Sequence, residues 1–160
     1  MPAERGAPST SGRKPAFRLI AVHVAVGIAV IAANLLAGVW GGVAWLRREP
    51  SVGFWYALRT AQAAVVLQVA LGAVLLLSGR EAAAGLHYLY GLLPLGVSLL
   101  AEGARAGAAE RELVGLDFEA LPQGRQRAIA IAIVRRETGI MAVSALVIVG
   151  LAVRAATTGG

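Results

Sequence analysis

The chain has no cysteine and only two histidines, His23 and His87, among its 160 residues. Without cysteine the protein can form neither a disulfide framework nor a thiolate metal site. Acidic residues are also scarce, nine against 15 lysines and arginines, so the formal net charge is +6. Because the basic residues lie between long apolar runs, we interpret them as charges that flank membrane segments, and we expect no nucleic-acid partner.

Hydrophobic residues make up 58% of the chain, and the mean hydropathy is +0.70. Soluble domains contain about 45–50% apolar residues, so this composition indicates an integral membrane protein. We predict an all-α fold, an antiparallel four-helix bundle whose first partner is the lipid bilayer. The expected location is a bacterial-type plasma membrane, which the chain crosses several times.

Four segments are predicted to cross the membrane, near residues 20–40, 60–78, 82–101 and 138–154. Gln68, inside the second segment, is expected to form an interhelical hydrogen bond. Pro94 is expected to kink or loosen the third. Met1–Pro15 reads as a disordered tail before a single domain, residues 16–160. The polar connection at residues 102–137 is predicted to be a long amphipathic loop with one or two interfacial helices.

The distribution of basic residues suggests an orientation. If both termini lie outside, the loops Arg47–Tyr56 and Glu102–Glu137 face the cytoplasm, and nine of the 15 basic residues lie inside. This total favours external termini, whereas the four basic residues before the first span favour the opposite orientation.

Each histidine lies in an apolar segment and is followed by glycine four residues later. His23-Val-Ala-Val-Gly27 and His87-Tyr-Leu-Tyr-Gly91 share the pattern H-x-x-x-G, and the same offset of 64 residues places Ser98 against Asn34. On a helix, positions four and eleven residues after the histidine fall on nearly the same face. Two helices are therefore predicted to present matching stripes of an imidazole, a gap and a small polar group.

The first and third spans run in the same direction, so both imidazoles should lie at a similar depth. Two facing imidazoles can bind haem iron axially, and Gly27 and Gly91 would leave room for the porphyrin edge. Cations and phenols suited to the haem propionates lie on the same side: Arg18, Arg80, Arg154, Tyr88 and Tyr90. We therefore predict a haem b site with His23 and His87 as the iron ligands.

Three motifs follow one another in the first three predicted helices. They are a histidine in the first, L-Q-V-A-L-G-A-V-L-L-L (Leu67–Leu77) in the second and L-H in the third. This order resembles one four-helix half of the haem A synthase family, over Ile20–Ala101. The resemblance implies that the two histidines face a haem near the outer leaflet. That family has eight spans, an arginine where this chain has Val24, and a glutamate where residues 19–20 are leucine and isoleucine. The resemblance thus implies haem binding without the synthase chemistry.

Three functions remain open. The first is a bis-histidine haem protein for electron transfer or haem handling, not expected to be an enzyme on its own. The second is a cofactor-free accessory or structural subunit, whose histidines hydrogen-bond neighbouring helices. The third is a small transporter, which is disfavoured because the spans hold no buried carboxylate for ion coupling. A zinc site would be incomplete with two histidines alone. A homodimer or another membrane partner is compatible with each function.

Overall fold

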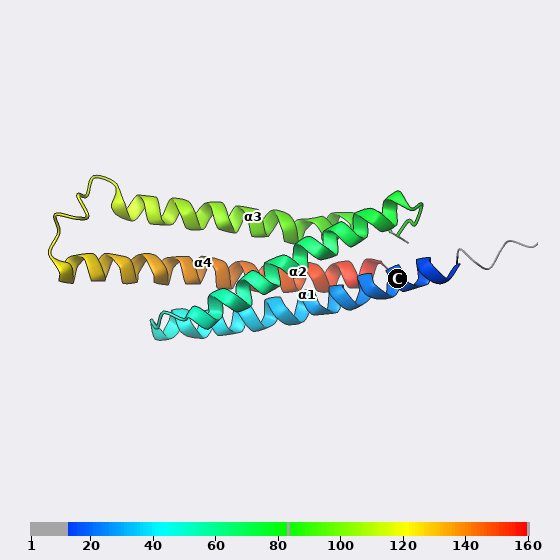
Figure 1. The fold of residues 1–160 in the computed structure, drawn as a ribbon, viewed down its shortest axis with the longest axis horizontal. Helices are drawn as coiled ribbons and strands as arrows, with labels where there is room; N and C mark the ends of the chain where they lie inside the picture. Colours follow the sequence, from blue (N-terminus) through cyan, green and yellow to red (C-terminus); the bar gives the residue numbers. More distant parts are fainter. Residues whose placement is uncertain (1–12, 83, 160) are drawn as a thin grey trace, which may run out of the picture.

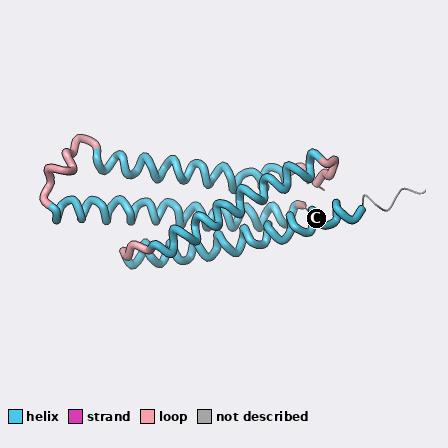
Figure 2. The backbone as a smooth tube through the Cα atoms, in the orientation of Figure 1, coloured by secondary structure: helices cyan, strands magenta, loops and turns pink. Residues whose placement is uncertain are grey.

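The computed structural model describes residues 13–82 and 84–159, and all regular secondary structure in these ranges is helical. The elements are α1 (Arg13–Arg47), α2 (Val52–Leu77), α3 (Leu86–Leu113) and α4 (Gln123–Thr158). Loops join successive helices (Figure 2). In Figure 1, α4 lies between α1 and α3, and α2 crosses obliquely from the end of α1 towards the start of α3. The predicted all-α four-helix bundle is confirmed.

Three of these helices are long and apolar enough to cross a membrane: α1 from Phe17 onwards, α2 and α4. Large apolar side chains on their outer faces are exposed, as lipid contact requires, among them Leu36, Val66 and Val147. Within the described ranges α3 does not meet the same criterion. Its apolar part is interrupted by His87 and Pro94 and ends at Glu102. The fold is that of a membrane protein, while a fourth crossing by α3 stays a prediction.

Residues 102–137, predicted to be a long amphipathic loop with one or two helices, are mostly helical in the structure. α3 continues to Leu113 and α4 begins at Gln123, so the two helices extend as a hairpin beyond the α1–α2 turn (Figure 1). Alanines, which favour helix, recur through this part of α3. Ion pairs join the two helices, Arg105 with Glu137 at 3.6 Å and Arg136 with Glu112 at 3.0 Å. The charges that suggested a membrane surface are thus partly used between the helices.

Two further boundaries differ from the prediction. Residues 1–12 of the expected tail lie outside the described residues, but Arg13–Pro15 belong to the first turn of α1, where a proline is tolerated. α3 begins at Leu86 instead of residue 82, and it continues through Pro94 without a break in the helix.

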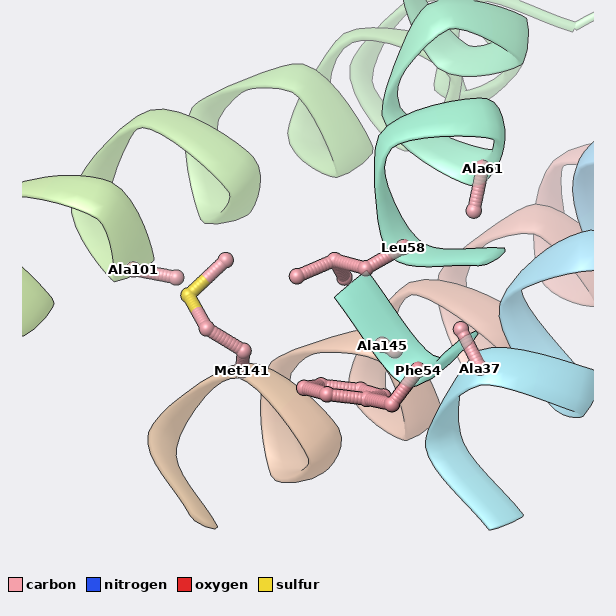
Figure 3. Close-up of a cluster of buried hydrophobic side chains, with 7 residues drawn as sticks. All are labelled: Ala37, Phe54, Leu58, Ala61, Ala101, Met141 and Ala145. Carbon is pink, nitrogen blue, oxygen red and sulfur yellow. The ribbon is translucent and has the colours of Figure 1, made fainter. Parts of the chain in front are cut away.

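The half of the bundle next to the α1–α2 turn, here called the packed end, holds a core around the fully buried Phe54 (0% exposed). All four helices contribute to it: Ala37, Phe54, Leu58, Ala61, Ala101, Met141 and Ala145 (Figure 3). The Met141 side chain extends between Ala101 and Leu58 (Figure 3). Glycine allows the close approach, because a Cβ at Gly41 would collide with the Phe54 ring. Such van der Waals packing is what holds helices together in lipid.

A polar network also crosses the packed end. Glu102 of α3 accepts hydrogen bonds from Arg59 and Gln62 of α2 and from Arg105, which also pairs with Glu137 of α4. Burial raises the pKa of the Glu102 carboxyl, but the hydrogen bonds from Gln62, Arg105 and Arg59 outweigh burial and hold this pKa below its ordinary value. The network ties α2, α3 and α4 together just beyond the apolar part of α3.

A candidate binding cavity with two histidines

At the opposite end of the bundle, next to the loop that joins α2 and α3, a cavity of about 620 Å³ lies among the four helices. We call it the histidine cavity. Its walls come from all four helices and from the α2–α3 loop, and they include His23, Gly27, Gln68, Gly72, Arg80, His87, Tyr88, Tyr90, Gly91, Ala155 and Gly159. Its volume is within the range of small-molecule sites, about 300–1,000 Å³.

Both predicted histidine stripes point into the bundle. The two imidazoles and the glycines that follow them line the histidine cavity. Further along each helix, Asn34 is 1% exposed and Ser98 is 8% exposed. Asn34 Nδ2 donates a hydrogen bond to the Val30 carbonyl oxygen at 2.9 Å. The helical spacing of the repeated motif therefore places the stripes as the sequence indicated.

The two imidazoles lie close to one another, with 6.3 Å between their ring centroids and 61° between their planes. A nitrogen–metal distance of about 2 Å on each side, with each ring centre about 1 Å behind its nitrogen, would place two imidazoles that share one metal roughly 6 Å apart. The separation of the rings is thus suitable for axial coordination of one iron.

Gln68 of α2 contacts the first imidazole. Its Nε2 lies 3.2 Å from His23 Nε2, which confirms the predicted interhelical hydrogen bond. His23 Nδ1 and Gln68 Oε1 are buried and have no hydrogen-bond partner among the described residues. Because an amide nitrogen donates, His23 Nε2 accepts and Nδ1 carries the ring proton. Buried polar atoms rarely lack partners, so this N–H and the Gln68 carbonyl oxygen mark a place where a polar ligand would be stabilised.

The second imidazole is oriented by α4. His87 Nδ1 lies 3.0 Å from the carbonyl oxygen of Ala155. Because a carbonyl oxygen only accepts hydrogen bonds, Nδ1 donates, and the lone pair of Nε2 is left for another ligand. Metal-binding histidines commonly have this arrangement. Gly159 packs on the same ring, where a Cβ would lie 2.5 Å from Nδ1.

The remaining predicted site residues divide into two groups. Arg80 and Tyr90 line the histidine cavity, and the Arg154 guanidinium lies 5.8 Å from the centre of the Tyr90 ring. Arg18 is exposed and does not line the cavity, which corrects its assignment to the site. It precedes His23 by five residues, which on a helix turns its side chain about 140° away from the imidazole.

The contribution of α4 could not be found from the histidine motif. Ala155 acts through its backbone carbonyl, which has no sequence signature, and Gly159 acts through the absence of a side chain. The one available signal was the tract of small residues at the end of α4, from Ala155 to Gly159. No group of three or more histidine, aspartate or glutamate side chains in the described ranges could hold a metal ion by itself.

The fold and the cavity together define an all-α membrane protein in which two imidazoles share one binding space. No family model, curated protein or solved structure matches the chain. The likeness to half of a haem A synthase therefore stays a prediction from the motifs alone.

Proposed function

We propose that the protein is a membrane b-type haem protein with His23 and His87 as axial ligands, acting in electron transfer or haem handling. One observation carries the proposal: the imidazole centroids lie 6.3 Å apart in a cavity of about 620 Å³. We place the protein in a bacterial-type plasma membrane, which it crosses four times with the cavity towards the outer side. When bound, haem would supply one-electron chemistry through its iron.

The cavity fits such a group in size, and His87 offers the lone pair of Nε2, because Nδ1 donates to Ala155. On His23 the Gln68 amide nitrogen donates to Nε2, so His23 would bind iron through Nε2 by exchanging this hydrogen bond for the iron bond. Valines and leucines form much of the remaining wall, among them Val24, Val69 and Leu92. An apolar wall with a few convergent polar groups favours a flat apolar ligand with a small polar part.

Separate residues would bind the outer parts of the ligand. Arg80 and Tyr90 provide a cation and a phenol at the end of the cavity, where they suit carboxylates such as haem propionates. A Cβ built on Gly91 meets no atom within 4 Å, so this wall has room for the edge of a planar ring.

A cofactor-free accessory subunit is the second candidate, and one observation favours it. Each imidazole already has a hydrogen-bond partner on another helix, Gln68 for His23 and Ala155 for His87. Hydrogen bonds of this kind hold helices together in membranes without any cofactor. In that case the histidines would contribute to stability and not to ligand binding.

Alanine variants distinguish the two candidates. We expect that His23→Ala and His87→Ala each abolish six-coordinate haem, measured as the visible spectrum and haem-to-protein ratio of the detergent-purified protein. Gln68→Ala serves as the matched control, because it removes the same interhelical hydrogen bond as His23→Ala but leaves both imidazoles in place. Haem content at the wild-type level in His23→Ala and His87→Ala would exclude axial ligation by this pair.

A further inference from the structure

At the packed end, the end of α1 and the part of α4 that faces it form a shallow crevice on the outer surface of the bundle. Residues from the end of α1 and the following turn form one side, and residues of α4 form the other, among them Trp45, Arg48, Glu49, Val134, Arg135 and Thr138. The crevice lies at the other end of the bundle from the histidine cavity, and the two share no lining residue.

The crevice brings together two arginines that no ion pair neutralises. Neither Arg48 nor Arg135 has a carboxylate oxygen within 4.0 Å in the described part of the chain, although Glu49 also lines the crevice. By contrast, Arg59 and Arg136 are both in ion pairs with glutamates. Two arginines on different elements thus line the crevice against a single glutamate, and this balance of charge favours an anion.

Arg48 also has an unusual backbone. Its φ is 59°, and it is the one non-glycine residue of the described chain with a positive φ. Hydrogen bonds from Arg48 N to Trp45 O at 3.3 Å and from Glu49 N to Ala44 O at 3.0 Å form the turn that ends α1. Glycine is usual at this position, because a side chain there strains the backbone. Strained positions of this kind are often kept for a function of the side chain.

The position of the crevice across the membrane identifies the kind of anion. Partly exposed aromatic residues surround this end of α1 and α2, namely Trp40, Trp45 and Tyr56. Tryptophan and tyrosine concentrate at membrane–water interfaces. The apolar run of α1 ends here at Leu46, and the apolar run of α4 at residues 138–153 begins here, directly after the charged residues 135–137. The crevice therefore lies where a bilayer presents its headgroup phosphates.

We propose that the crevice binds the phosphate of an anionic phospholipid, held by Arg48 and Arg135 beside the Trp45 indole. The proposal needs only a protein embedded in a membrane, and it is independent of the haem assignment. An arginine near a membrane surface contributes about a fivefold change in affinity for anionic lipid. Each of the two arginines should therefore have an effect of this size.

The test is a titration of the detergent-purified protein with phosphatidylglycerol, with bound lipid counted by native mass spectrometry. Arg48→Gly is the most informative variant, because glycine relieves the backbone strain. It should raise the thermal unfolding temperature and weaken phosphatidylglycerol binding about fivefold. Arg135→Gln should weaken binding to a similar extent. If Arg48→Gly is more stable and binds phosphatidylglycerol as tightly as the wild type, the proposal is wrong.

Two controls distinguish a specific lipid site from diffuse charge attraction and from a soluble-phosphate site. Arg127→Gln removes the same charge from an exposed position of α4 that does not line the crevice, and it should leave the affinity unchanged. An equal loss in Arg127→Gln would indicate diffuse surface attraction and overturn the site. Inorganic phosphate at millimolar concentration should not displace the lipid. Displacement would assign the crevice to a soluble phosphate and overturn the lipid assignment.

Discussion

The two ends of the bundle are built from the same four helices but are packed in opposite ways. At the packed end, side chains from all four helices meet around Phe54, and the Glu102 network closes the surface. At the histidine end, side chains of the same four helices leave a cavity of about 620 Å³. One end thus holds the helices together, and this allows the other end to stay open for a ligand.

Glycines show part of this difference. At the packed end a glycine makes room for an aromatic ring of another element, as Gly41 does for Phe54 and Gly139 for Trp45. At the histidine end Gly159 likewise makes room for the His87 ring, but a Cβ on Gly91, which lines the cavity, would meet nothing within 4 Å. Substitutions at the two ends should therefore affect different properties, stability at the first and binding at the second.

The largest effect on stability is expected for Phe54→Ala. Removing this fully buried ring should lower the free energy of unfolding by about 3 kcal/mol, at the lower end of the range for buried aromatic residues, because lipid lessens the apolar transfer contribution. Unfolding of the detergent-solubilised protein measures it. A loss below about 1 kcal/mol would show that the packed end does not dominate stability.

A smaller loss, about 1 kcal/mol, is expected for Glu102→Gln, because the network is partly exposed. The effect should depend on pH. The pKa of the folded carboxyl is lowered, so its contribution is fully present above the ordinary value of 4.5 and disappears as pH falls through the lowered pKa. Wild type should therefore lose stability in this acidic window, and the variant should lose less. Parallel pH profiles would contradict this account of the network.

Gln68→Ala should cost still less, roughly 0.6 kcal/mol, the average for interhelical hydrogen bonds in membranes. The His23 ring should become less restrained, and ligand binding should persist. Thermal unfolding with and without added haem measures both quantities. Complete loss of haem in this variant would mean that Gln68 is essential for positioning the imidazole and not merely supportive.

The smallest effect on stability, within about 0.5 kcal/mol, is expected for Gly91→Leu, because the added side chain enters open space and leucine is favourable in lipid. The same change should block a planar ligand. Gly96→Leu is the matched control, since a Cβ there also meets nothing within 4 Å but Gly96 does not line the histidine cavity. Haem binding should be lost in the first variant and kept in the second.

Much of the fold could be predicted because its signals are local. Long apolar runs and helical periodicity indicated the helices, and the spacing from His23 to Asn34 and from His87 to Ser98 indicated which faces turn inwards. The helical hairpin of α3 and α4 could not be predicted in this way. Its charged and alanine-rich sequence suits an interfacial helix equally well, and the pairing of Glu112 with Arg136 is a tertiary contact.

The candidate site was predictable only in part, for a similar reason. The imidazoles and glycines are marked by a repeat, whereas Ala155 contributes a backbone carbonyl that any residue could provide. Arg18 was assigned from its depth, but its position around α1 turns it away from the cavity. The cavity itself follows from the packing of all four helices and not from any single segment.

The central claim is that the histidine cavity binds haem between His23 and His87. The most direct test is the visible absorption spectrum of the wild-type protein, oxidised and reduced, after purification in detergent from cells supplied with ample haem. We predict a red protein with one haem per chain and the spectrum of a six-coordinate, bis-histidine b-type haem. A colourless protein under these conditions would contradict the claim.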